Sequence, residues 1–203
     1  MDLIISKAFG DTKSNQKRKH NKDCTRIIFA DSSLPLLDGM HKYAEKITFN
    51  GDLDKDYAIA IGLNPAKGEE NSFDSTNRKV ANDIQQKKYK GYLLLNLYSV
   101  IEPNCNKLCS YIKHNPKDMR NNLQDVVLKQ VLDSNNDIFI FWGPNAKEKR
   151  LLTNPYLLKI LEVLLATGRK IYYSSDANNN FVHPANKNFS NFQLLANMQT
   201  LEI

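Results

Sequence analysis

Hydrophobic residues in this chain gather in four short continuous runs, each flanked by Gly, Asn or Asp. Runs of this length without polar alternation are typical of strands that are covered on both faces, as in a parallel sheet. They predict strands over Tyr57–Leu63, Tyr92–Leu97, Ile138–Trp142 and Lys170–Ser174.

Elsewhere the apolar residues recur at helical spacing. Helices are predicted over Ser75–Lys88, Lys117–Leu132 and Pro155–Ala166. Ahead of the first run, the pattern predicts an edge strand over Arg26–Ala30 and a helix over Leu34–Lys46. Strands that alternate with helices predict an α/β fold, here a three-layer sandwich around a central, mainly parallel four-stranded sheet.

Polar residues follow the carboxyl ends of the predicted strands. Asn64 follows the first strand, Asn96 closes the second and His183 lies beyond the fourth. Carboxyl ends of parallel strands meet at one edge of a sheet, and ligands of such folds bind there. We therefore expect these three side chains to meet at the mouth of the sheet, although each alone also fits a turn or a surface residue.

Length and hydropathy limit the classes of protein to consider. A chain of 203 residues can form one domain with a real core. No run approaches the ~18 apolar residues that cross a bilayer. The N-terminus has acid before its apolar residues and basic residues after them, the reverse of a signal peptide. A soluble cytoplasmic protein with no membrane partner is expected, and the sequence gives no indication of its oligomeric state.

The formal net charge of +6 favours a polyanionic partner. Part of it lies in residues 1–25, a basic N-terminal segment that we separate from a single domain over residues 26–203. This segment is either a solvated, mobile arm or an arm that contacts phosphates. Three cysteines indicate neither a disulfide framework nor a metal site, and no cofactor is predicted.

Four motifs, in order along the chain, resemble the uracil-DNA glycosylase superfamily: Gly62–Ala66 (GLNPA), Gly91–Asn96 (GYLLLN), Phe141–Lys147 (FWGPNAK) and His183–Lys187 (HPANK). The first is similar to the water-activating motif of that superfamily, and the last to its His-Pro loop. A related family of unknown function shares the Asn-Pro, Asp-x-Thr, Asn-Leu, Trp-Gly and His-Pro pattern more closely still. The resemblance extends over roughly residues 57–188 and implies a uracil-DNA-glycosylase-like fold.

The resemblance also implies an enzyme that flips a base out of duplex DNA and hydrolyses its N-glycosidic bond. Asn64 would hold the attacking water, His183 would donate to the leaving base and Asn96 would read the base edge. Phe73 would stack on the base, unless it is a core residue. The other residues that the resemblance places at the base are Gly62, Leu63, Pro65 and Ala66.

Asp74 has two interpretations that the sequence leaves open. It follows the first motif closely, so it could lie near the same water and act as the base that Asn64 cannot be. It also fits the N-cap of the helix that begins at Ser75, a role that contributes ~1 kcal/mol and needs no catalysis.

Departures from the uracil-specific enzymes bear on the substrate. Where those enzymes have a Tyr that excludes substituents at the pyrimidine 5-position, this chain has Ala66. The resemblance then implies a pocket open to a 5-substituted cytosine, such as the glucosylated hydroxymethylcytosine of phage DNA, and so a role in defence against phage. No Lys is placed to form a Schiff base, so we expect a monofunctional enzyme that leaves an abasic site.

Three lysines are candidate contacts to DNA phosphates, although each also fits a solvated surface. They are Lys147 and Lys149, after the third strand, and Lys187, in the His-Pro loop. The polar segment 175–182, which precedes His183, predicts a mobile loop.

Two other functions stay open on the sequence alone. One is an N-glycosidase that acts on a free nucleoside or nucleotide, and the other is a DNA-binding module without catalysis. Binding to DNA should weaken steeply with salt, and loss of the Asn64 side chain should leave a binding module unaffected.

Overall fold

The computed structural model of the protein describes part of the chain, and every structural statement below refers to that part. The described residues are 14–15, 24–36, 39–49, 56–65, 74–98, 100–102, 104–114, 135–143, 162, 165–166 and 168–196.

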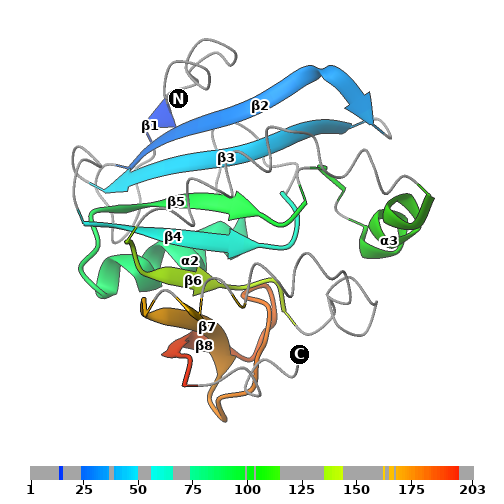
Figure 1. Cartoon of the computed structure of the whole chain (residues 1–203). Coiled ribbons are helices and arrows are strands. Elements are labelled where there is room, and N and C mark those ends of the chain that lie inside the picture. Colours follow the sequence, from blue (N-terminus) through cyan, green and yellow to red (C-terminus); the bar gives the residue numbers. More distant parts are fainter. Residues whose placement is uncertain are drawn as a thin grey trace.

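A single twisted sheet organises these residues (Figure 1). Its strand order is β1-β2-β3-β5-β4-β6-β7-β8. The strands are β1 (Ser14–Asn15), β2 (Cys24–Leu36), β3 (Gly39–Phe49), β4 (Tyr57–Gly62), β5 (Gly91–Asn96), β6 (Ile138–Ile140), β7 (Ile171–Asp176) and β8 (Phe189–Leu194). The predicted boundary at residue 26 falls inside β2.

The centre of the sheet consists of the four strands that the apolar runs predict. β4 pairs in parallel with β5 on one side and with β6 on the other, and β6 pairs in parallel with β7. The α/β class and the parallel centre are therefore confirmed. The sheet is larger than predicted, with eight strands instead of four, because antiparallel strands extend it beyond β5 and beyond β7.

The predicted helix over residues 34–46 is wrong, because most of this segment belongs to strands β2 and β3. β3 pairs antiparallel with β2 along one side and with β5 along the other. Its end carries the buried residues Ile47 and Phe49, a β-branched and an aromatic side chain. Backbone pairing on both sides outweighs the weak helical spacing of the local sequence.

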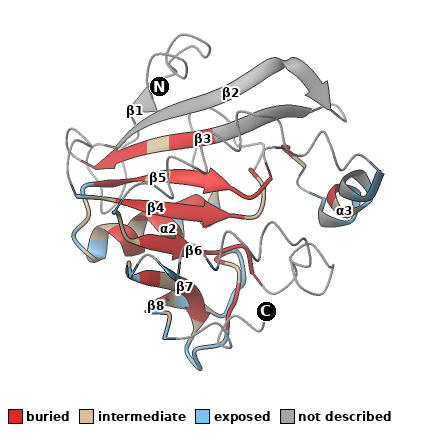
Figure 2. Cartoon of the chain, in the orientation of Figure 1, coloured by how far each residue is buried: buried red, intermediate tan, exposed pale blue. Residues whose placement is uncertain are grey.

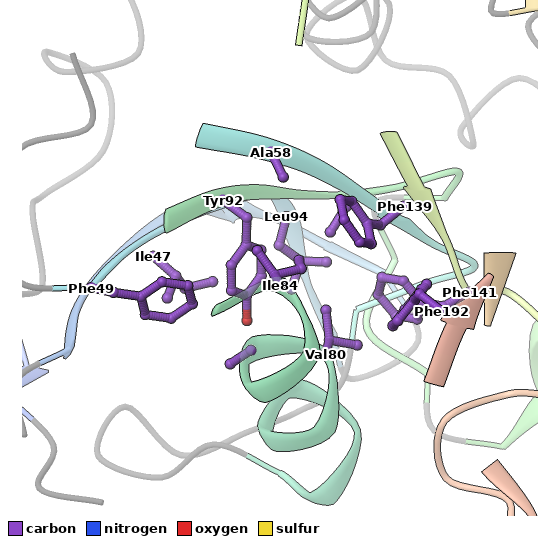
Figure 3. Close-up of a cluster of buried hydrophobic side chains, with 12 residues drawn as sticks. Ile47, Phe49, Ala58, Val80, Ile84, Tyr92, Leu94, Phe139, Phe141 and Phe192 are labelled. Atoms are coloured by element: carbon purple, nitrogen blue, oxygen red, sulfur yellow. The ribbon is translucent and has the colours of Figure 1, made fainter. Parts of the chain in front are cut away.

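Helix α2 (Ser75–Gln86) lies against one face of the sheet and begins as predicted, directly after Asp74. Figure 3 shows Val80 and Ile84 of the helix pointing at Tyr92 and Leu94 of β5. All four are at most 4% exposed. Burial of apolar surface contributes about 25 cal/mol per Å², so this contact stabilises the helix and the sheet together.

The central strands consist mostly of buried residues (Figure 2). Ile59 and Ile61 of β4 point away from the α2 face and are each 1% exposed, while Ala58 and Ala60 on the α2 face are fully buried. Coverage on both faces explains why these strands are continuously apolar instead of alternating.

Several predicted helices lie wholly or partly outside the described residues. The helix predicted over 117–132 lies outside them, and of the helix predicted over 155–166 only residues 162, 165 and 166 are described, all helical. Helix α3 (Cys105–His114) and strand β8 have no counterpart in the sequence prediction. Among the described helices, none has the length and apolar character to cross a membrane.

Candidate functional site

The carboxyl ends of β4, β5 and β6 come together at one edge of the sheet, as the sequence predicts. Gly62 at the end of β4 is paired with Asn96 at the end of β5, and the amide of Leu97 donates to the carbonyl of Gly62 at 3.0 Å. Just past β6, the amide of Phe141 donates to the carbonyl of Ile61 at 3.0 Å. These bonds hold the residues that follow each strand side by side.

A cavity of about 330 Å³ opens at this edge. Its volume is near the lower end of the range found for small-molecule sites, roughly 300–1,000 Å³. It brings together residues from segments more than 100 positions apart in the sequence. The lining includes six residues that the sequence predicts for the site: Leu63, Asn64, Pro65, Asp74, Asn96 and His183.

Asn64 is half-buried in the cavity wall, and its amide orientation is fixed mainly by the shorter of two hydrogen bonds from Nδ2, the longer being 3.5 Å to the carbonyl of Pro65. Its Nδ2 donates to the backbone carbonyl of Glu102 at 2.7 Å. A carbonyl oxygen can only accept a hydrogen bond. The Nδ2 atom of Asn64, which is the donor of the amide, must therefore face it. Within the described part of the chain no donor bonds to the other amide atom, Oδ1, which is therefore the atom that can accept from a water or a ligand.

Asp74 is the N-cap of α2, which confirms one of its two interpretations. Its Oδ1 accepts from the amide of Asn77 at 2.7 Å, the geometry of a helix cap. Its Oδ2 lies 3.5 Å from Nδ2 of Asn77, too far for a strong bond. Since the side chain also lines the cavity, the cap uses one oxygen and leaves the other for the cavity.

His183 is held as a neutral donor. Its Nδ1 accepts from the amide of Ala185 at 3.1 Å, so the proton of the neutral ring lies on Nε2. Burial lowers the pKa of His183 below its ordinary value; the carboxylate of Asp74 opposes this effect and the ammonium of Lys79 adds to it. At neutral pH the ring therefore presents an N–H donor without a positive charge.

Two glycines create the space in which these side chains meet. A Cβ at Gly62 would lie 2.7 Å from Oδ1 of Asn96 and 2.9 Å from the ring of Phe141. A Cβ at Gly143 would lie 2.8 Å from Cβ of His183, and Gly143 also has a φ of +77°. These contacts explain the glycines of the GLNPA and FWGPNAK motifs, and the second was not among the predicted site residues.

The segment ahead of His183 is a hydrogen-bonded turn, and its predicted mobility stays a prediction. One carboxylate oxygen of Asp176 accepts from the amides of Asn178 and Asn180, each at 2.9 Å. The hydroxyl of Ser174 donates to the carbonyl of Val182 at 2.6 Å. The abundance of Asn in this segment supplies a turn, because Asn and Asp side chains readily bond to nearby backbone.

The structure adds two carboxyl groups that sequence reasoning missed. Glu45 of β3 is 2% exposed and lies opposite Leu94 of β5, and Glu102 follows the end of β5. Both line the cavity with Asp74, and no Lys or Arg side chain is among its described lining residues. Glu45 could not be found because its segment was predicted as a helix. No group of three acidic, His or Cys side chains in the described residues could hold a metal ion.

Of the remaining predicted site residues, Gly62 and Lys187 are described, and neither is part of the cavity lining. Lys187 is exposed. The others, Ala66, Phe73, Lys147 and Lys149, lie outside the described residues. Three features therefore stay predictions: the open 5-position wall, the stacking aromatic and the phosphate contacts of all three lysines.

Comparison with known proteins places the chain in a family. No curated protein and no solved structure gives a significant match. A family model described as a protein of unknown function, DUF1643, matches residues 46–185. The match covers more than half of the 203 residues and includes Asn64, Asp74, Asn96 and His183. The chain therefore belongs to the DUF1643 family.

Proposed function

We propose that the protein is a monofunctional DNA glycosylase of the uracil-DNA glycosylase superfamily, with a three-layer fold of that type. It takes a flipped modified pyrimidine into the cavity and hydrolyses the N-glycosidic bond, leaving an abasic site. The observation that carries this proposal is that Asn64, Asp74, Asn96 and His183 line one cavity at the carboxyl edge of the sheet. Four polar residues predicted for one reaction thus share one small space.

The side-chain geometry suits the reaction. A water held on Oδ1 of Asn64 attacks C1′ of the sugar, the C1′–N bond breaks, and the base leaves with its electron pair. The proton of the water passes to the carboxylate of Asp74, which also faces the positive charge that develops on the sugar. The neutral Nε2–H of His183 donates to the oxygen of the leaving base, where negative charge accumulates.

The charge distribution favours a base in the cavity and phosphates outside it. Three carboxyl groups line the cavity, from Glu45, Asp74 and Glu102, and a phosphate placed among them would be repelled. The whole chain nevertheless carries a formal charge of +6, which attracts a DNA backbone. A free nucleotide fits this arrangement less well than a DNA strand whose phosphates remain on the surface near Lys187.

The substrate that we propose is a 5-substituted cytosine, including glucosylated hydroxymethylcytosine, and the biological role is defence against phage. Support comes from Ala66, which stands where uracil-specific enzymes of the superfamily have a Tyr that excludes 5-substituents. The Asn96 amide can read cytosine or uracil, depending on its orientation.

The test is release of base from DNA duplexes containing uracil, a thymine mismatch, 5-hydroxymethylcytosine or glucosylated hydroxymethylcytosine. Abasic sites are scored by alkaline strand cleavage. We expect cleavage of the glucosylated substrate, and a loss of ~100-fold or more in Asn64→Ala. Asn178→Ala, which removes an exposed Asn that is not part of the cavity lining, is the matched control and should keep full activity.

Other outcomes would reject the proposal in distinct ways. Salt-sensitive DNA binding without cleavage of any duplex, unchanged in Asn64→Ala, would identify a DNA-binding module. Release of base from free nucleosides, with no dependence of affinity on salt, would identify a nucleoside hydrolase. Cleavage of uracil in preference to the glucosylated base would reject the substrate class and keep the reaction.

A further inference from the structure

Lys79 joins helix α2 to the loop that carries His183. Its Nζ donates to the carbonyl of Pro184 at 2.7 Å and to the carbonyl of Asn186 at 3.2 Å. The ammonium also lies 5.5 Å from the centroid of the Phe189 ring, a cation–π distance. The side chain is half-buried, so these charge-assisted bonds are stronger than those of a fully exposed lysine.

The same helix carries Asp74 at its N-cap. Asp74 is bonded to the amide of Asn77 in the first turn, and Lys79 lies five residues further along the chain. Because a capped helix is rigid over this distance, a bond from Lys79 to the His183 loop fixes the loop relative to Asp74. Gly143 also packs against the loop, so closely that a Cβ at position 143 would lie 2.8 Å from Cβ of His183.

We infer that Lys79 is a positioning residue, which holds the His183 ring in a set place relative to Asp74. It acts through the Pro184 and Asn186 carbonyls and is not itself among the cavity-lining residues. Only the catalytic consequence rests on the proposed function; the effect on His183 itself does not.

Asp74 and Lys79 act in opposite directions on the pKa of His183. Glu45 on β3, Asp74 at the N-cap of α2 and Glu102 after β5 line the cavity with His183. Negative charge near a histidine favours its protonated form. Lys79 is a cation whose charge counters that of Asp74 and lowers the pKa of His183. Its removal should therefore loosen the loop and raise that pKa.

The test compares substitutions of two half-buried lysines, Lys79 in α2 and Lys87 at its C-cap. Lys79→Met removes the charge and the donors but keeps the apolar stem, Lys79→Gln keeps an amide donor without charge, and Lys79→Arg keeps both. Lys87→Met is the matched control: Lys87 lies 3.8 Å from Asp83 and 5.2 Å from the Tyr172 ring, at the other end of α2.

The first readout is the NMR titration of the His183 ring, assigned with His183→Gln, together with the backbone amide signals of residues 183–187. In Lys79→Met we expect a higher pKa of His183 and shifted amide signals. Lys79→Gln should raise the pKa with smaller amide shifts, and Lys79→Arg and Lys87→Met should match the parent. Should Lys79→Met not fold, the Gln and Arg variants still give this comparison.

The second readout is base release on the substrate found for the parent. A positioning role predicts a ~10- to 100-fold lower kcat in Lys79→Met with a nearly unchanged KM, and recovery in Lys79→Arg. An unchanged His183 titration and unchanged loop signals in Lys79→Met, or equal changes in Lys87→Met, would overturn the inference. Changed titration in a protein that cleaves no substrate would uphold it and count against the proposed function instead.

Discussion

The two ends of the central strands differ in how their polar groups are satisfied. At the amino ends, polar groups bond to one another. The hydroxyl of Tyr89 donates to the carboxylate of Asp137 at 2.5 Å, and Lys90 bonds to Asp56 through its backbone amide at 2.9 Å and through its side chain at 3.9 Å. These four residues bond to one another, and none of them lines the cavity.

At the carboxyl ends the polar groups surround a cavity. Asn64 and Asp74 each use one side-chain atom to bond to backbone and turn toward a shared space with Asn96 and His183. The comparison teaches that two polar side chains bonded to each other at a strand end contribute to the stability of the fold. Polar side chains that line a cavity and keep an atom for a ligand indicate a functional site. Substitutions at the amino ends should therefore change stability alone, and those at the carboxyl ends should change activity most.

The largest expected effect comes from Asp74→Asn. Asn is as good an N-cap as Asp, so the free energy of unfolding should change by less than about 0.5 kcal/mol. The carboxylate is lost, so base release should fall roughly 100- to 10,000-fold if Asp74 accepts the proton of the water. Both quantities are measured on the same protein, by urea unfolding and by abasic-site formation.

Asp74→Ala is the companion variant, because it removes the cap as well as the charge. It should lose about 1 kcal/mol of stability in addition to the activity. If Asp74→Asn keeps full activity and only Asp74→Ala loses it, Asp74 is a helix cap and not a catalytic base. Asn64 would then be the main group that acts on the water.

The next effect comes from Gly143→Ala, which brings a methyl group to 2.8 Å from Cβ of His183. We expect a loss of about 1–3 kcal/mol from the left-handed backbone, and at least a tenfold loss of activity from displacement of the ring. Gly168→Ala is the matched control, since Gly168 has a similar φ of +68° and no atom within 4 Å of the added Cβ. Equal activity losses in the two variants would show that backbone strain, and not contact with His183, is responsible.

The parallel centre of the fold could be predicted from the sequence because its causes are local. Ile59 and Ile61 are buried on one face of β4 and Ala58 and Ala60 on the other, so the strand had to be continuously apolar. The start of α2 was also predictable, since a capping side chain at Asp74 acts within one turn. Three site residues were predictable from their places at or beyond strand ends: Asn64, Asn96 and His183.

What the sequence could not predict depends on distant partners. β3 is a strand because β2 and β5 bond to it on either side, and nothing within residues 34–46 encodes that pairing. Glu45 enters the cavity wall only through this pairing. The contact of Lys79 with Pro184 joins residues 105 positions apart, which no local pattern indicates.

A smaller effect, confined to stability, is expected for Tyr89→Phe at the opposite end of the strands. The substitution leaves the carboxylate of Asp137 without the hydroxyl donor, which costs about 1–3 kcal/mol when the group is partly buried. Activity per folded molecule should be unchanged, because neither residue lines the cavity. Urea unfolding measures the loss of stability and the cleavage assay measures activity, both well below the melting temperature. Lost activity in a fully folded variant would contradict the separation of the two ends.

The smallest effect is the pH dependence that His183 contributes to stability. Its pKa is lowered in the folded protein, so between that value and the ordinary 6.5 the unfolded chain binds more protons than the folded one. Stability must then fall as the pH drops below about 6.5, by at most about 1.4 kcal/mol for each unit of pKa shift. We expect His183→Gln to remove this part of the decline between pH 7.5 and pH 5, while His114→Gln, at an exposed position, leaves it in place. The check is urea unfolding of the three proteins across that range. An equal decline in the parent and in His183→Gln would mean that the imidazole is not held neutral by its surroundings, and the donor role of its Nε2–H would lose its physical basis.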